Sequence, residues 1–423
     1  MVEEAAVHGQ EGDAPRPRVA IVCGHFMPEV GYQEVWIART LAYLGARVRV
    51  VTSVAVSSSA RRILAAAYPA GRSWMPEGYE VVRLPVVFRF RSIVLSRGVL
   101  AAVEEWDPQL ICLLSIGKLF GSPVLSAAAV HERPIACFFS ELHEYRKRHS
   151  LPARVVAWAQ DWGMRLVKER FYRQAIRRAT VLVCNSPGTL QWLRERCRTA
   201  EEYEALAAKA RVMTLGYESR LFFFDAAERQ RMRCAFGIGD NDVVVITVTR
   251  VVAHKGLERI IDAIGTLQRS GYPVWYLLVG GMGDAYQREL EYRMQRQPQP
   301  ERFRLLPFST PEGVRQLAAG ADVGVWMQIA ISATEAMGTG LPLLLPRRFS
   351  LSHLLHEGIN GWYWDEPNGF EERLAQVVEN LMTLSEEQRV QQRRWLAHEN
   401  ARRFAYESIL RRVFVEAGLH PWW

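Results

Sequence analysis

The sequence predicts an α/β protein of two domains, each built on a doubly wound parallel sheet. Short apolar runs of strand length alternate with amphipathic segments of helix length along most of the chain, which is typical of parallel sheets covered by helices on both faces. The strands fall into two sets, separated by a polar stretch that contains glycine. With 423 residues, 49% of them hydrophobic, the chain is long enough for two cores of ordinary size.

The first domain is expected over residues 18–214. Its strands are short, largely apolar runs, each followed by a longer segment in which apolar and charged residues alternate with helical spacing. We place these strands at Val19–Val22, Val48–Val51, Val81–Leu84, Leu110–Leu114, Ile135–Phe139 and Val181–Cys184.

The second domain is expected over residues 243–402, and a linker over residues 215–242 joins it to the first. Residues 1–17 are polar and charged, so we expect a disordered leader there. The strands of the second domain begin near Val243, Val274, Phe303, Val323 and Leu343. Helices are then expected over residues 372–381, 386–404 and 408–417, and we treat residues 403–423 as a separate C-terminal segment.

Composition excludes several classes of protein. No apolar run is long enough to span a bilayer, and the first residues lack the basic flank and apolar core of a signal peptide, so we expect a cytoplasmic protein. The six cysteines are scattered and include no Cys-x-x-Cys pair. Reduced and mostly buried thiols are therefore favoured over metal ligands.

The charge balance favours an anionic partner. Lys plus Arg number 53 and Asp plus Glu 45, which gives a formal net charge of +8. A phosphorylated substrate, an anionic membrane surface or a nucleic acid would each fit this charge. Nucleic acid is disfavoured, because the sequence has no recognition-helix pattern, RNA-binding aromatic signature or zinc spacing.

The segment from Val243 to Pro346 places charged residues and glycines where strands give way to helices. Arg250 and Lys255 follow the first of these strands, next to the start of an amphipathic helix. A helix N-terminus with two cations beside it attracts anions, because unpaired N–H groups and the positive end of the helix dipole point outward there. Later strands lead into a glycine turn and into Glu335, so several strand ends carry polar groups to one edge of the sheet.

This ordered pattern resembles the C-terminal domain of a family 4 glycosyltransferase. That family reads Gly-Arg, then Lys-Gly, then Gly-x-Gly, and finally Glu-Ala-Met-Ala-x-Gly-x-Pro. The likeness extends from about Arg18 to Glu407, since residues 18–53 resemble the opening strand, glycine loop and helix of the same family. The residues that match the C-terminal pattern are Arg250, Lys255, Gly256, Gly281, Gly283, Glu335, Ala336, Met337, Gly340 and Pro342.

The resemblance implies a fold and an activity. The fold would be two Rossmann-like domains facing across a cleft, the glycosyltransferase B type, with the last helix returning to the N-terminal domain. The activity would be retaining transfer of a sugar from a nucleotide-diphosphate sugar, held by the second domain, to a glycan, lipid-linked or other hydroxyl acceptor, held by the first. Such transfer is used in cell-surface polysaccharide and glycoconjugate synthesis. No cofactor and no metal are expected, because two cations can replace a divalent ion at the diphosphate.

The resemblance also assigns roles to residues of the second domain. Arg250 and Lys255 would stabilise the departing diphosphate, and Glu335 would accept hydrogen bonds from the ribose. Each also has a purely structural interpretation: a loop cap for Arg250, a solvated helix start for Lys255, and a charge that complements a helix dipole for Glu335.

The remaining contacts of the nucleotide sugar are expected nearby. Gly281 and Gly283 would let the backbone approach the ligand, although a simple strand-to-helix turn also explains them. Phe308 could pack against the base, or it could be a core aromatic. Ser332 and Thr334, next to Glu335, complete the expected binding residues.

One position departs from the family. The family has a second glutamate eight residues before the one matched by Glu335, and here that position is Met327. The loop between Asp322 and Glu335 is also shorter than usual. The sugar contact would then be altered, or supplied by Gln328, Ser332 or backbone. A catalytically impaired partner subunit that binds a nucleotide or glycan is therefore an alternative, and a sugar-phosphate phosphorylase is a third.

In the first domain, Gly31 matches the family glycine that faces the diphosphate and the acceptor. Its neighbours Tyr32 and Gln33 replace the usual second glycine and would shape the choice of acceptor. His143 follows a strand and resembles the family histidine near the reacting carbon, where it would contact the donor sugar; a structural histidine is the alternative.

Two segments combine apolar and basic residues, over residues 87–100 and 151–179. Such segments can lie in an anionic membrane interface, which would make the protein peripheral at the inner face of the membrane. For the second segment, a long helix that buries its apolar stripe against the sheet explains the pattern as well.

Overall fold

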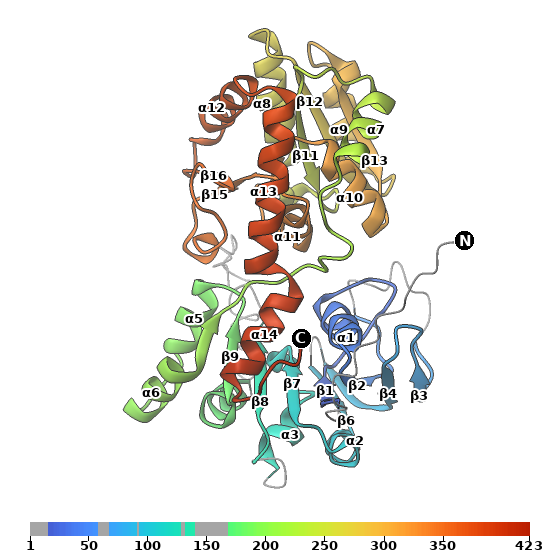
Figure 1. The fold of residues 1–423 in the computed structure, drawn as a ribbon, viewed down its shortest axis with the longest axis vertical. Coiled ribbons are helices and arrows are strands. Elements are labelled where there is room, and N and C mark those ends of the chain that lie inside the picture. The colour runs from blue at the N-terminus through green and yellow to red at the C-terminus, as the bar shows by residue number, and fades with distance from the viewer. Residues whose placement is uncertain (1–15, 58–66, 91–92, 128–131, 140–167) are drawn as a thin grey trace, which may run out of the picture.

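The computed structural model describes residues 16–57, 67–90, 93–127, 132–139 and 168–423. These residues form two lobes, with the N-terminal half of the chain below and most of the C-terminal half above in Figure 1. Each lobe is a mainly parallel sheet covered by helices, so the predicted fold class is confirmed.

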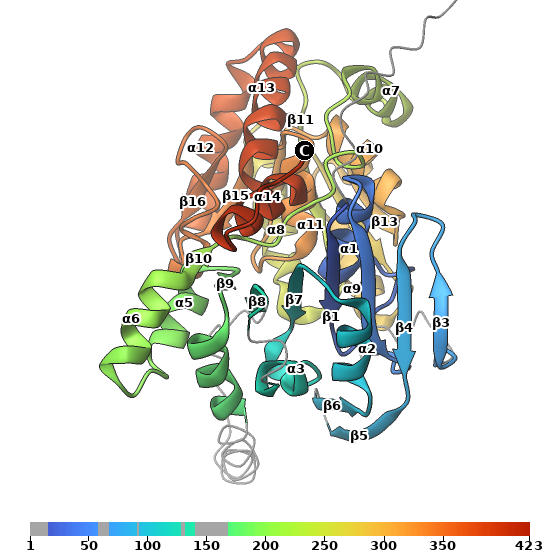
Figure 2. The same cartoon turned by 60° about the horizontal axis from the view of Figure 1, so that its bottom comes forward.

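The N-terminal sheet has the strand order β10-β9-β8-β7-β1-β2-β4-β3. All neighbours pair in parallel except β3 and β4, which are antiparallel at one edge. Beyond the end of β4, β5 and β6 form a separate hairpin (Figure 2). The strands are β1 (Arg18–Val22), β2 (Arg47–Ser53), β3 (Gly71–Trp74), β4 (Glu80–Leu84), β5 (Val86–Phe90), β6 (Ile93–Ser96), β7 (Leu110–Leu114), β8 (Ile135–Phe139), β9 (Val181–Cys184) and β10 (Ala210–Val212).

The C-terminal sheet is parallel throughout, in the order β13-β12-β11-β14-β15-β16. The chain winds outward from β11 in one direction and from β14 in the other, so the strand order reverses between these two strands. The strands are β11 (Val243–Val248), β12 (Val274–Gly281), β13 (Phe303–Pro307), β14 (Val323–Val325), β15 (Leu343–Pro346) and β16 (Gly361–Trp364).

Helices cover both faces of each sheet, because the central strands are buried on both sides. The helices are α1 (Gln33–Tyr43), α2 (Val99–Trp106), α3 (Ser122–Ser126), α5 (Pro187–Arg194), α6 (Ala200–Lys209), α7 (Ala226–Phe236), α8 (Leu257–Arg269), α9 (Ala285–Gln295), α10 (Pro311–Gly320), α11 (Ile331–Gly338), α12 (Phe370–Met382), α13 (Glu386–Phe404) and α14 (Tyr406–Glu416). None of the helices in the described ranges is both long and apolar enough to cross a membrane.

The reversal of strand order positions the sites. In open parallel sheets, ligands bind outside the carboxyl ends of the strands where the order reverses. The N-terminal sheet reverses between β1 and β7, and the C-terminal sheet between β11 and β14. The two carboxyl edges face each other, because Gly188, which follows β9, lies against Ser350, which follows β15: a Cβ on Gly188 would be 3.2 Å from the Cβ of Ser350.

The last two helices join the domains. In Figure 1, α13 runs along the upper lobe and α14 continues into the lower lobe beside α1. The backbone bends at Ala405, whose ψ of 144° ends α13. Apolar residues of α14, including Leu410 and Phe414, are then buried in the same core as Val35 and Leu41 of α1.

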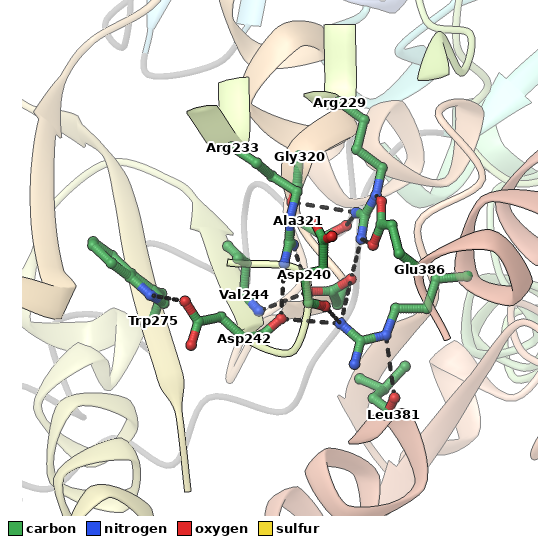
Figure 3. A network of polar contacts seen from close by, with 12 residues as sticks. Arg229, Arg233, Asp240, Asp242, Val244, Trp275, Gly320, Ala321, Leu381 and Glu386 are labelled. Atoms are coloured by element: carbon green, nitrogen blue, oxygen red, sulfur yellow. Dashed lines mark hydrogen bonds and ion pairs between the residues drawn. The ribbon is translucent and has the colours of Figure 1, made fainter. Parts of the chain in front are cut away.

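The expected linker, residues 215–242, contains α7, and a buried network of charges attaches this helix to the C-terminal domain (Figure 3). Asp322 accepts hydrogen bonds from Arg229 at 2.7 Å, from Arg233 at 3.1 Å and from the backbone N–H of Val244 at 2.8 Å. Burial would raise the pKa of Asp322, but the arginines Arg229, Arg233 and Arg389 more than offset burial and lower this pKa to about 2. The carboxylate is therefore charged, and α7 is part of the second domain.

Candidate functional site at the carboxyl edge of the C-terminal sheet

The carboxyl ends of β11, β12, β13 and β14 carry the residues that the sequence singled out in the second domain. Arg250 and Lys255 follow β11, the glycine turn follows β12, and Phe308 follows β13. Ser332, Thr334 and Glu335 lie in α11, which follows β14. The structure therefore brings them to one edge of the sheet, around the point where the strand order reverses.

The loop from β11 to α8 presents the two cations. Arg250 is exposed and has no hydrogen bond or ion pair with any residue in the described ranges. Lys255 is half-buried and ends a short 3₁₀ turn, Ala253–Lys255, just before α8. Gly256 then adopts φ +64°, a left-handed conformation that glycine adopts without strain. The Arg250 guanidinium is free to meet an anion.

Two hydrogen bonds fix the segment from the end of β14 to the start of α11 against the end of β11. The indole Nε1 of Trp326 donates to the carbonyl of Val248 at 3.0 Å, and the hydroxyl of Ser332 donates to the same carbonyl. The hydroxyl of Thr334 donates to the carbonyl of Ile331 at 2.8 Å. The protons of both hydroxyls are therefore already used, so Ser332 and Thr334 hold the loop in place and could meet a ligand only as acceptors.

Glu335 is half-buried, and its carboxyl group has no hydrogen bond or ion pair with the described part of the chain. Burial raises the pKa of Glu335 to about 7. A half-buried carboxyl group without a protein donor can accept hydrogen bonds from a ligand. A ligand with hydroxyl donors would satisfy this carboxyl.

Met327 occupies the place of the missing family glutamate. It packs against the start of α8, where a Cβ on Gly256 would lie 3.3 Å from the Cγ of Met327. No carboxylate is available at this position. The neighbouring Gln328 has a buried amide oxygen without a hydrogen-bond partner, so it could accept a hydrogen bond from a ligand.

The glycine turn after β12 is explained by packing. Gly280 adopts φ +123°, and a Cβ there would lie 2.0 Å from the carbonyl oxygen of Thr249. The N–H of Gly283 donates to the side chain of Gln287 at 2.7 Å, and Asp284 caps α9. A Cβ on Gly281 would lie 2.7 Å from that same side-chain oxygen of Gln287. The turn thus packs two strand ends and starts a helix, and the N–H of Gly283 is not free for a ligand.

Phe308 is 68% exposed, so the interpretation as a core aromatic is wrong. Its N–H donates to the carbonyl of Gly281 at 3.1 Å, which holds the residue at the edge of the sheet. An exposed ring fixed beside the other strand ends can stack on a flat ligand.

In the N-terminal domain, Gly31 lies in the loop between β1 and α1. It adopts φ +68°, and a Cβ there would lie 3.0 Å from the ring of Trp36, so only glycine fits without strain. His143 lies outside the described residues. The sequence did not single out His25, Glu34 and Lys118, which the fold gathers at the reversal point of this sheet; their positions directly after β1, at the start of α1 and after β7 were the available signal. In the described ranges, no group of three or more His, Cys, Asp or Glu could hold a metal ion.

Comparison with known proteins places both halves of the chain in related families. Residues 35–208 match the glycosyl transferase 4-like domain, and residues 228–395 match the glycosyl transferases group 1 model. A comparison of the sequence with curated proteins finds no significant match.

Solved structures of similar fold cover almost the whole chain. HepE from Anabaena in complex with UDP has a TM-score of 0.65 at 17% identity, over 94% of this chain and 98% of that one. Sucrose-phosphate synthase from Thermosynechococcus elongatus has a TM-score of 0.64 at 15% identity, over 95% and 100%. WaaG, a glycosyltransferase involved in lipopolysaccharide biosynthesis, has a TM-score of 0.58 at 16% identity, over 95% and 100%. With one family model matching each domain, the chain is a glycosyltransferase of the two-domain GT-B type.

Proposed function

We propose that this enzyme is a retaining hexosyltransferase that uses a nucleotide-diphosphate sugar and a hydroxyl acceptor. The observation that carries the proposal is that Arg250 and Glu335 lie on either side of the reversal point of the C-terminal sheet, each with a charged or polar side-chain group that has no partner in the described residues. The Arg250 guanidinium can pair with a diphosphate, and the Glu335 carboxyl group can accept hydrogen bonds from a ribose. HepE, a structure of similar fold, was solved with UDP and with UDP-glucose.

The nucleoside would lie between Glu335 and Phe308. The vicinal hydroxyls of a ribose supply two donors to the unpartnered carboxyl of Glu335. The exposed ring of Phe308, at the end of β13, would pack against the base.

The diphosphate would lie against Arg250, Lys255 and the N-terminus of α8. Negative charge grows on the diphosphate as the bond to the anomeric carbon breaks, and a preorganised donor at such a place can contribute about 3 to 4 kcal/mol to lowering the barrier. These cations would do the work of a divalent ion, so we propose turnover without a metal. The acceptor oxygen bonds to the anomeric carbon on the face that the diphosphate leaves, and its proton passes to a departing phosphate oxygen.

The sugar would meet Gln328 and not a carboxylate. Its buried amide oxygen has no partner and could accept one hydroxyl donor. Met327, next to it, presents only a thioether over the start of α8. Recognition of the sugar would then be weaker or different from that given by a glutamate.

The acceptor, a glycan or a lipid-linked or other hydroxyl compound, would be held by the N-terminal domain, with Gly31 at the junction and His143 near the sugar. Synthesis of cell-surface polysaccharide or glycoconjugate would fit such an acceptor.

We also propose a peripheral contact with anionic membrane through the hairpin of β5 and β6. Val87, Phe88 and Phe90 of β5 are each about half exposed or more, and Arg89 lies among them. Most of the second basic segment, residues 151–167, lies outside the described residues. Flotation with anionic and with neutral liposomes tests the contact: equal recovery in both would contradict it.

Release of nucleoside diphosphate from a panel of uridine, guanosine and adenosine sugars tests the activity. Arg250→Ala should lower kcat by about a hundredfold or more. Arg269→Ala is the matched control, because Arg269 is exposed and ends α8, at the terminus opposite to the loop that carries Arg250. A chelator should leave turnover intact, and activity that needs added magnesium would overturn the metal-free proposal.

The absence of a carboxylate at Met327 favours one second candidate, a nucleotide- or glycan-binding partner subunit with little activity of its own. The same panel of nucleotide sugars distinguishes the transferase from the partner subunit. Saturable binding of a nucleotide sugar with no release of diphosphate, and no change on Met327→Glu, would favour the partner subunit.

A further inference from the structure

The reversal point of the N-terminal sheet carries polar groups that the proposed donor site does not use. β1 ends at Val22 and leads to Gly24 and His25, and the neighbouring β7 ends at Leu114 and leads to Lys118. The two strands pair in parallel, with Val22 beside Leu113, so both loops leave the same edge side by side. This is where a parallel sheet binds its ligands.

His25 is buried but has no polar partner. It is 4% exposed, and neither ring nitrogen makes a hydrogen bond within the described part of the chain. A neutral imidazole carries one donor and one acceptor, and burying both without partners is unfavourable. Buried polar groups of this kind point to a ligand or an ordered water.

Lys118 lies within electrostatic reach of His25 and of Glu34, although it forms no salt bridge with that carboxyl group. Its side chain passes Gly24, where a Cβ would lie 3.7 Å from the Cδ of Lys118, so glycine leaves the lysine room. Within the described residues its ammonium group makes no hydrogen bond and no ion pair. The turn that presents it is strained, because Ser115 and Leu119 adopt φ 56° and 62°, and such strain is concentrated at functional sites.

The charged groups nearest to His25 are mainly cations. Arg89 of β5 is near enough to act electrostatically on His25, and its Nη2 donates to the carbonyl of Val56 at 2.9 Å. Burial, together with the charges of Lys118 and Arg89, lowers the pKa of His25 to about 3, so the imidazole is neutral. Glu34, at the start of α1, is the nearby acid; burial raises its pKa, and the charge of Lys118 partly offsets this rise. The group that would lie against His25 is therefore an anion with acceptor oxygens.

We infer that His25 and Lys118 bind a phosphate group of the acceptor substrate, with Arg89 contributing charge. His25 would donate one N–H to a phosphate oxygen, and the Lys118 ammonium would pair with the phosphate charge. This inference rests on the proposed transferase function and narrows the acceptor to a phosphorylated compound. The donor diphosphate lies on the other sheet, at Arg250, so two separate phosphate sites would face each other.

The first test is binding of inorganic phosphate and of UDP, measured by calorimetry at low ionic strength on the full chain. Lys118→Met keeps the length of the side chain and removes its charge, and Arg194→Met removes one exposed cation of the same domain. We expect saturation with UDP to leave one phosphate site, which Lys118→Met weakens about tenfold or more and Arg194→Met does not change. Equal phosphate affinity in the Lys118→Met and wild-type proteins would overturn the inference.

The second test separates the sources of the phosphate. Glucose, glucose 6-phosphate and dodecyl phosphate are compared as ligands of the UDP-saturated protein. Tighter binding of glucose 6-phosphate than glucose, lost in Lys118→Met, assigns a soluble sugar phosphate, whereas tighter binding of dodecyl phosphate assigns a lipid phosphate. Equal binding of all three would contradict the inference.

His25→Asn is a further variant, in which folding is checked by circular dichroism. It should weaken phosphate binding while UDP binding is unchanged. The outcomes also distinguish this inference from the proposed function. Phosphate binding that depends on Lys118, with no nucleotide sugar bound or consumed, would contradict only the transferase. Turnover of a nucleotide sugar with unchanged phosphate binding in Lys118→Met would contradict only the phosphate site.

Discussion

The carboxyl group of Glu335 should make the stability of the protein depend on pH in a calculable way. Burial raises the pKa of Glu335 from the ordinary value of 4.5 to about 7 in the folded protein. Between these values the folded state keeps a proton that the unfolded state has lost, so stability falls as pH rises. The fall begins near the unfolded pKa and is complete above the folded one.

The size of the effect follows from the two pKa values. Their difference, multiplied by about 1.36 kcal/mol per pH unit, gives about 3.4 kcal/mol as an upper limit. Glu335→Gln removes the ionisation and keeps the shape. The variant should match the wild type at pH 4 and be more stable by up to about 3 kcal/mol at pH 8.

Urea unfolding of both proteins across this range is the assay, and the difference between them cancels the other titrating groups. Glu312→Gln is the matched control, because Glu312 is exposed in the first turn of α10. A difference between wild type and Glu335→Gln that does not change with pH would refute the reasoning, and so would a Gln variant that is less stable at pH 8.

The same group should couple nucleotide binding to proton release. Ribose hydroxyls donate to the ionised carboxylate, so binding favours loss of the proton. Calorimetry at pH 7 in two buffers of different ionisation enthalpy should show release of about half a proton per nucleoside diphosphate bound, and none in Glu335→Gln. Identical heats in the two buffers would show that the ribose does not reach this carboxyl.

Three further substitutions test the packing and the contacts around the candidate site. Gly280→Ala should destabilise the protein by about 3 kcal/mol or more in urea unfolding, because its Cβ would meet the carbonyl of Thr249, whereas Gly271→Ala, with φ +86° and open space around it, should cost only about 1 kcal/mol. Asp322→Asn should destabilise it by about 3 to 5 kcal/mol in the same assay, since the buried arginines lose their counter-charge. Phe308→Ala should leave the urea midpoint unchanged and weaken nucleoside binding about two- to tenfold by calorimetry, because the ring is exposed and offers only stacking. An unchanged midpoint in either of the first two, or a lowered midpoint in the third, would contradict the packing described for that residue.

The buried strands could be predicted from the sequence because burial on both faces requires continuous apolar runs. The expected bounds of β7, β8 and β9 agree with the structure residue for residue. Two of the strands that the sequence did not predict, β3 and β5, lack such a buried pattern. All of β3 is exposed, and β5 is exposed or half-buried along its length. Pairing at an edge is set by neighbouring strands, which local sequence does not encode.

Helix α7 shows that a buried polar segment also cannot be predicted from local sequence. Its sequence, AAERQRMRCAF, is rich in charge and was assigned to a linker. The charges are buried because their partners, Asp322 and Glu386, come from distant parts of the chain. A charged residue with a buried partner cannot be told from a solvated one without the fold.

In the candidate site, the sequence could predict which residues lie at strand ends, because topology brings such ends to one edge. The sequence could not predict how exposed these residues are or which groups lie next to them. The exposed ring of Phe308 and the raised pKa of Glu335 both depend on what the rest of the fold places around them. The only local signal for His25 and Lys118 was their position after a strand end, which other polar loop residues share; their burial and neighbours depend on the fold.

The chain crosses between the domains twice, and the two crossing segments lie side by side. Tyr217 of the first crossing forms a bridge with Ala405 of the second, and the N–H of Tyr406 donates to the carbonyl of Tyr217 at 3.0 Å. Burial raises the pKa of Tyr406, and the charges of Glu335 and Glu34 raise it further, so this phenol lies within electrostatic reach of a carboxyl from each domain. A nucleotide that ionises Glu335 would add negative charge at this crossing, and the energy of that charge depends on how near the N-terminal Glu34 lies. Donor binding that ionises Glu335 would therefore change the balance of charge where the chain crosses between the two domains.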